Sequence, residues 1–101
     1  MLLKKIENTK ENLTECYYDS SNILKSIYHK NSKDLDVVFK RGAVYRYREV
    51  PTKIVLDFQK EESQGKYLNK VLIKDYKATK IVNVNTLQLV EHIQRLKEEQ
   101  S

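Results

Sequence analysis

An α+β fold is predicted, with a small antiparallel β-sheet of three to four strands around a central hairpin, followed by two or three helices. Three observations predict it. Short apolar or alternating runs separated by polar turns fill residues 13–48. A loop that contains glycine divides two of these runs at residues 40–42. Beyond Pro51, apolar side chains recur at helical spacing as far as residue 96.

Length and composition fit one soluble domain. The 101 residues are 40% hydrophobic and 33% charged, which is typical of a globular chain. No apolar run approaches the roughly 20 residues of a membrane helix, and charges follow Met1 too soon for a secretory signal. The single cysteine, Cys16, excludes an internal disulfide and indicates a reducing compartment. We therefore expect a cytoplasmic protein without a membrane partner.

The strands are expected in a single block. Residues 1–12 show no clear period and are predicted to form a short helix or an extended arm. Strands are predicted over residues 13–18, 22–29, 35–39 and 43–48. The main domain is expected to cover residues 13–80, with residues 81–101 as a C-terminal helical extension.

The loop length of the central hairpin decides which face is buried. A two-residue loop would mix arginines with the apolar side chains of the core. A three-residue loop with Gly42 in a left-handed conformation pairs Val37 with Tyr45 on an apolar face. It also pairs Asp36 with Arg46 on the opposite face. A slip of one residue would exchange the two faces, so the second register is predicted.

Three helical segments follow. Pro51 is predicted to be the first residue of a helix in which Ile54 and Phe58 point inward. Residues 66–76 have helical spacing, although their centre is also compatible with a strand. Asn85 is the expected cap of the last helix.

The last helix carries one apolar stripe. The stripe can pack back on the domain, or it can mediate self-association, because its spacing is also that of a coiled coil. The candidate oligomer-interface residues are Leu89, Val90, Ile93 and Leu96.

Positive charge is concentrated in the middle of the chain. Residues 40–80 hold eleven Lys and Arg against five Asp and Glu, whereas the whole chain has a net charge of +5. Such a concentration attracts phosphates. The alternative is that exposed lysines only keep a small domain soluble.

Two regions could bind an anion. Arg46 and Arg48 are expected on one face of the hairpin. They could form an anion-binding patch there, or the face could simply be exposed to solvent. Gly65 begins a helix near Lys66 and Lys70, so backbone N–H groups there could bind phosphate. The alternative is a turn in which Gly65 is a left-handed cap. The candidate phosphate-binding residues are Arg41, Arg46, Arg48, Gly65, Lys66, Tyr67, Asn69 and Lys70.

The two tyrosines of the hairpin could be core residues or could bind a base. Tyr45 and Tyr47 are expected to be core residues, covered by the helix that begins at Pro51. Base stacking on them would require an uncovered face.

No catalytic constellation is visible. His29 and His92 each lack a second ligand at metal spacing, and Cys16 has no basic neighbour in sequence. We expect no enzyme activity, no metal and no cofactor.

Several segments together resemble the KTSC domain over about residues 19–76. They are residues 20–23, 35–39, 42–47 (GAVYRY), 50–51, Phe58 and 63–69 (SQGKYLN). Arg41-Gly42 departs from the Asn-Gly turn usual in that family. The resemblance implies a domain found at the C-terminus of some lysyl-tRNA synthetases and as a free-standing protein of bacteria and phages. It implies no established activity, and its synthetase context suggests RNA binding.

Two functions are therefore expected as alternatives. The first is a non-enzymatic binding module for phosphate-bearing ligands, RNA or a nucleotide. The second is a homo-oligomeric interaction or adaptor protein that works through its C-terminal helix.

Overall fold

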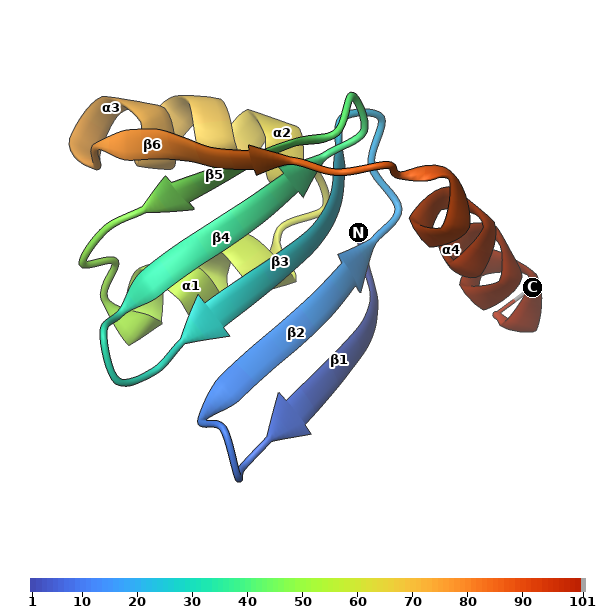
Figure 1. Cartoon of the computed structure of the whole chain (residues 1–101), viewed down its shortest axis with the longest axis horizontal. Coiled ribbons are helices and arrows are strands. Elements are labelled where there is room, and N and C mark those ends of the chain that lie inside the picture. The colour runs from blue at the N-terminus through green and yellow to red at the C-terminus, as the bar shows by residue number, and fades with distance from the viewer. Residues whose placement is uncertain (101) are drawn as a thin grey trace.

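The computed structural model describes residues 1–100 and contains one antiparallel sheet against which the helices pack (Figure 1). The strands lie side by side in chain order: β1 (Leu2–Asn8), β2 (Leu13–Tyr18), β3 (Ile23–His29), β4 (Asp34–Phe39), β5 (Ala43–Tyr47) and β6 (Ala78–Asn83). The helices are α1 (Thr52–Lys60), α2 (Gln64–Tyr67), a π-helical turn η1 (Leu68–Leu72), α3 (Ile73–Asp75) and α4 (Leu87–Glu99). The α+β class is confirmed, whereas the prediction of three to four strands is wrong.

The two additional strands are the edges of the sheet. β1 lies where a short helix or an arm was predicted, and it pairs with β2 along its length. β6 pairs with β5 across residue 80, so the predicted domain boundary at this residue falls inside a strand. Every side chain of β6 is exposed. An edge strand that buries so little leaves no alternating pattern in the sequence.

The predicted register of the central hairpin is confirmed. Val37 pairs with Tyr45 and Asp36 pairs with Arg46. Gly42 has a φ of 105°, a conformation that favours glycine, and its N–H donates to the carbonyl oxygen of Phe39 at 2.9 Å.

The main core lies between the sheet and the helices α1 to α3. Phe58 is fully buried and packs edge-on against Tyr18, with ring centroids 5.5 Å apart. Val55 is also buried, and Ile54, the other predicted anchor, is only partly so. Pro51 precedes the helix as its N-cap rather than forming its first residue. The helix therefore begins where predicted, to within one position.

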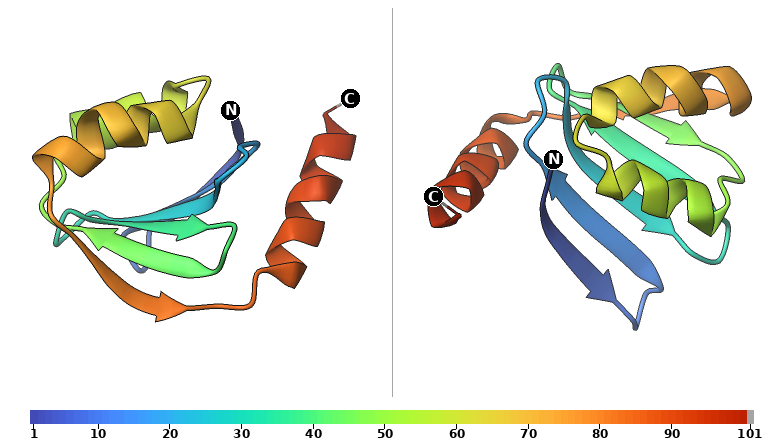
Figure 2. Two further views of the ribbon diagram at one scale, coloured as in Figure 1. Left: turned by 90° about the horizontal axis from the view of Figure 1, so that it is seen from above. Right: turned by 180° about the vertical axis from the view of Figure 1, so that it is seen from behind.

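Helix α4 lies apart from the other helices and packs on a second, smaller core (Figure 2). Ile93 and Leu96 are buried there against Leu3, Tyr17 and Leu24. Leu89 and Val90 pack partly on the same cluster. These contacts match the alternative in which the stripe packs back on its own domain, and the oligomer-interface alternative stays a prediction, because Leu89 and Val90 are only partly buried.

The ends of α4 are also held by the chain. The side chain of Asn85 accepts a hydrogen bond from the N–H of Leu87 at 3.0 Å, while Thr86 is the N-cap. The amide of Gln100 donates to the carbonyl oxygen of Leu3 at 2.6 Å.

Within residues 1–100, no helix combines the length and the apolar content that crossing a membrane would require.

Candidate ligand-binding pocket

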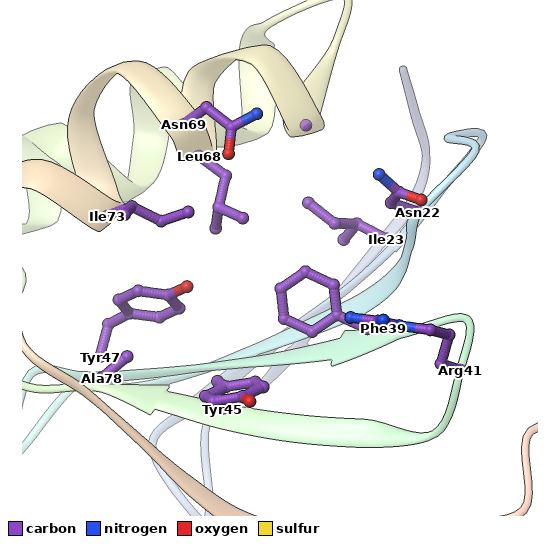
Figure 3. A pocket seen from close by; sticks show the side chains of 11 residues that line it. Asn22, Ile23, Phe39, Arg41, Tyr45, Tyr47, Leu68, Asn69, Ile73 and Ala78 are labelled. Carbon is purple, nitrogen blue, oxygen red and sulfur yellow. The ribbon is translucent and has the colours of Figure 1, made fainter.

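A pocket of about 360 Å³ opens between the helical segment 64–75 and strands β3 to β5 (Figure 3). Its volume lies in the range of small-molecule sites, about 300–1,000 Å³. Its wall is mostly apolar and aromatic, formed by Ile23, Phe39, Tyr45, Tyr47, Leu68 and Ile73. Polar groups stand at its rim: Asn22, Arg41 and Asn69.

The aromatic wall follows from the hairpin register. Tyr45 and Tyr47 are two positions apart on β5, so both side chains lie on the face that the helices cover. Phe39 packs edge-on against Tyr45, with ring centroids 5.7 Å apart. Tyr47 is buried, and burial together with Tyr45 raises its pKa. Tyr45 is only partly buried and lines the pocket.

Tyr47 is a core residue as predicted, buried in one cluster with Val55 and Phe58 of α1, whereas Tyr45 is only partly buried. The lining residues on the helical side all come from the segment 64–75, namely Gly65, Leu68, Asn69 and Ile73. This segment stands far enough from β5 to leave an open volume. Tyr45 is therefore the hairpin tyrosine that keeps accessible surface beside the pocket, and an uncovered face is the condition set for base stacking.

Gly65 contributes bare backbone to the pocket. It lies in the first turn of α2, after Ser63, whose Oγ accepts a hydrogen bond from the N–H of Lys66 at 3.3 Å. Its φ is not positive, so the alternative of a left-handed cap is wrong. A Cβ placed on Gly65 would meet no atom within 4 Å. Gly65 is also one of the residues that line the pocket.

A π-helical turn shapes the same wall. Leu68 and Asn69, both pocket residues, are the first two residues of η1. Such turns insert one residue into an α-helix and are frequent at functional sites. The spacing of apolar residues in 66–76 did not reveal it, because one extra residue hardly disturbs a short helical pattern.

Arg41 is the one predicted cation that lines the pocket. It is exposed at the tip of the β4–β5 hairpin. Within residues 1–100, its guanidinium has neither an ion pair nor a hydrogen bond. Its five N–H donors are free to bind an anion at the mouth of the pocket.

Arg46 and Arg48 lie on the opposite face of the sheet and are neutralised there. Nε of Arg46 donates to Oδ1 of Asp36 at 2.7 Å, and a second nitrogen of the same guanidinium donates to Oδ2 at 2.9 Å. Arg48 lies 3.5 Å from Asp34. The prediction that both arginines share a site with the turn at Gly65 is wrong.

The carboxylate of Asp36 is also bound by histidine. Nε2 of His29 lies 2.9 Å from its Oδ2. Burial disfavours the charged form of Asp36, but the hydrogen bonds from Arg46 and His29 outweigh it and hold its pKa below the usual range. Asp36, Arg46 and His29 therefore pair with one another on this face of the sheet.

The remaining candidates do not line the pocket. Tyr67 is turned toward α1, where its ring lies 6.1 Å from that of Phe58, and desolvation raises its pKa. Lys66 and Lys70 are exposed on the helical segment. Arg41, Gly65 and Asn69 are therefore the predicted residues that the pocket brings together.

Among the pocket residues that sequence reasoning missed are Asn22 and Phe39. Both fall in segments that carry the family resemblance, and Phe39 ends a predicted strand beside the glycine loop. Their convergence depends on the pairing of β3 with β4, which no local pattern reveals. Within residues 1–100, no group of His, Cys, Asp and Glu side chains is arranged to hold a metal ion.

Comparisons with known proteins agree with this architecture. The model of the KTSC domain family matches residues 19–76. A crystal structure of a KTSC domain protein from Yersinia pestis is similar, with a TM-score of 0.65 and 24% sequence identity. The similarity covers 69% of this chain and 99% of that chain. Comparison with curated proteins gave no match. Strands β1, β2 and β6 and helix α4 lie outside the residues that the family model matches.

Proposed function

The chain belongs to the KTSC domain family, and we propose that it is a non-catalytic module whose pocket binds one nucleotide unit, free or within a strand of RNA. In this proposal the base enters between Tyr45 and Leu68, and a phosphate binds Arg41. Aromatic side chains suit a planar base, since each stacked base contributes about 1–3 kcal/mol. The amides of Asn22 and Asn69 offer donors and acceptors for its edge.

The unpaired Arg41 is the observation that carries the proposal. Arg46 and Arg48 are bound by carboxylates on the far face, whereas no carboxylate of residues 1–100 pairs with Arg41. A guanidinium binds phosphate through two parallel hydrogen bonds. A free guanidinium beside an aromatic pocket therefore matches a ligand with a planar part and an anionic part.

Gly65 supports the same function. Glycine in a helix costs roughly 0.5–1 kcal/mol relative to alanine. The backbone here needs no glycine, and a methyl group would meet open space. A glycine that destabilises its helix and borders a pocket is consistent with a ligand that approaches the backbone closely.

A cytoplasmic location is part of the proposal. Cys16 is a free thiol buried in the core, and burial raises its pKa, which keeps it protonated and unreactive. A free thiol of this kind suits a reducing compartment.

Calorimetric titration with adenosine 5′-monophosphate, adenosine and ribose 5-phosphate tests the proposal. We expect the monophosphate to bind more tightly than either fragment. Arg41→Gln should weaken binding of the monophosphate about tenfold, since a charge-assisted hydrogen bond contributes about 1.5–3 kcal/mol. The affinity for adenosine should be unchanged.

Arg95→Gln, an exposed change of equal charge on α4, is the control and should leave all three affinities unchanged. No binding of any of the three ligands at millimolar concentration, or equal losses in the two variants, would contradict the proposal.

A further inference from the structure

We propose that the pocket is the middle of a longer groove, and that the groove binds a single-stranded polynucleotide rather than a free mononucleotide. This inference rests on the proposed function and names the ligand class for the same site. Three features carry it: hollows that continue the pocket at both ends, unpaired cations along its sides, and a lysine of β6 on the face of the sheet that lines it.

The pocket continues beyond the hairpin tip. A second hollow of about 340 Å³ shares Asn22, Phe39 and Arg41 with the pocket and adds Lys40 to the lining. Both Lys40 and Arg41 are exposed. One end of the groove therefore carries two positive charges.

The pocket also continues at its opposite end. A third hollow of about 480 Å³ shares Tyr47, Ile73 and Ala78 with it and is lined by Lys74 and Lys77. In Figure 3, Arg41 and Asn22 lie at one end of the pocket and Ile73, Tyr47 and Ala78 at the other. Strand β5 from Ala43 to Tyr47 spans about 13 Å, given a rise of roughly 3.3 Å per residue, and Arg41 lies in the hairpin turn before it.

The balance of charge in the three hollows is positive. Asp75 is the acidic residue among their lining residues, against four cations. Within residues 1–100, none of these cations has a salt-bridge partner. A ligand therefore breaks no salt bridge of the described chain when it binds these four cations.

A row of lysines follows the helical wall of the groove. Lys66, Lys70 and Lys74 lie four residues apart, so they share one face of the helical segment. Each directly follows a residue that lines the pocket, namely Gly65, Asn69 or Ile73. All three lysines are exposed. Lys74 lines the third hollow, and Lys66 and Lys70 add positive charge to the same helical segment.

Strand β6 places one more lysine on the other wall. Tyr47 pairs with Ala78 and Tyr45 pairs with Lys80. Directly opposed residues of antiparallel strands lie on the same face, and Tyr45 lines the pocket. Lys80 therefore lies on the pocket face, two positions along β6 from Ala78, which also lines the pocket.

A mononucleotide does not use this arrangement. Its phosphate lies at one end of the molecule, and it would leave the cations at the other end of the groove without a partner. A polynucleotide has a phosphate on both sides of each internal base. The two charged ends then bind successive phosphates while the pocket holds the base between them.

Fluorescence titrations over a range of salt concentrations test the inference. The probes are adenosine 5′-monophosphate and eight-nucleotide adenylate strands of RNA and of DNA. We expect the octamer to bind at least about tenfold more tightly than the monophosphate, with a steeper salt dependence, because each phosphate contact adds about 0.7 to the slope for single strands. The RNA and DNA arms identify which strand the groove prefers.

The double variant Lys74→Gln, Lys77→Gln should weaken octamer binding about tenfold and lower the slope by about 1.4. It should leave monophosphate binding unchanged. Lys53→Gln, Lys60→Gln on α1 makes the same change in net charge away from the hollows and should alter neither ligand.

The outcomes separate this inference from the proposed function. Monophosphate binding without a gain for either octamer overturns the inference and leaves the proposed function standing. Octamer binding that is equally sensitive to both double variants also overturns it, because the extra affinity then comes from net charge. Absence of binding to all probes overturns both.

Discussion

The carbonyl oxygen of Val84 lies 2.5 Å from the position that a Cβ on Gly42 would occupy. The same two residues are hydrogen-bonded, with the N–H of Val84 donating to the carbonyl oxygen of Gly42 at 2.8 Å. Oγ1 of Thr86 donates to the carbonyl oxygen of Lys40 at 3.0 Å. The segment between β6 and α4 therefore holds the hairpin tip on both sides of Arg41.

Gly42→Ala should destabilise the protein by about 2–3 kcal/mol, because it combines a strained φ with a backbone overlap. Urea unfolding measures the change. Gly65→Ala, the other glycine variant, should not destabilise. A Gly42→Ala protein as stable as wild type would show that the linker does not contact the hairpin as described.

Thr86→Val should weaken binding of adenosine 5′-monophosphate about two- to fivefold, since one hydrogen bond contributes about 0.5–1.5 kcal/mol. Adenosine binding should be unchanged, because the hydrogen bond positions Arg41 rather than the base wall. Thr79→Val is the control on β6. Equal losses for adenosine and its monophosphate would mean that Thr86 acts on the fold alone.

Gly65→Ala should raise the free energy of unfolding by about 0.5–1 kcal/mol, because alanine is the better helix former. The same variant should bind nucleotide less tightly, and Gly65→Leu should abolish binding by filling the pocket. Thermal unfolding and calorimetry on the same samples measure both effects. A stabilised variant with undiminished affinity would show that Gly65 is not part of the binding site.

The Asp36 network predicts a pH dependence of stability. The folded-state pKa of Asp36 lies below its unfolded-state value of about 3.9, so the native state binds fewer protons. Its contribution is therefore fully present above that unfolded-state pKa and is lost as pH falls through the lower folded-state pKa.

Asp36→Asn should cost about 2–3 kcal/mol at pH 7, toward the lower end for a broken buried pair because Arg46 can be rehydrated. Its stability should fall less than that of wild type under acid. Parallel acid-denaturation curves for the two proteins would contradict the assignment.

Leu96→Ala should lower the free energy of unfolding by about 2–3 kcal/mol, since the side chain is buried in a small cluster. The midpoint of thermal unfolding should not vary with protein concentration in either protein. If the midpoint of the wild-type protein depends on concentration and that of the variant does not, the stripe of α4 would be an interface between chains.

The parts of the fold that follow local rules were predictable from sequence. The hairpin register follows from a three-residue loop and the need to keep Arg46 out of the core, and helix α1 follows from Pro51 and the spacing up to Phe58. The edge strands were not predictable, because β6 buries no side chain and therefore carries no pattern.

The candidate site was predicted only in part, for the same reason. Arg41, Gly65 and Asn69 are marked by charge or by a glycine at a helix start. Charge alone did not separate Arg41 from Arg46, because the carboxylate that neutralises Arg46 lies on the neighbouring strand. Partners across strands decide which cations are free, and sequence spacing does not show them.

The most direct measurement is a two-dimensional amide NMR titration of the wild-type protein with adenosine 5′-monophosphate. A nucleotide pocket predicts saturable shifts for the amides of Asn22, Arg41, Gly65 and Asn69, while those of Asp36 and Arg48 on the far face stay in place. Saturable shifts confined to the far face, or unchanged spectra at millimolar ligand, would contradict it.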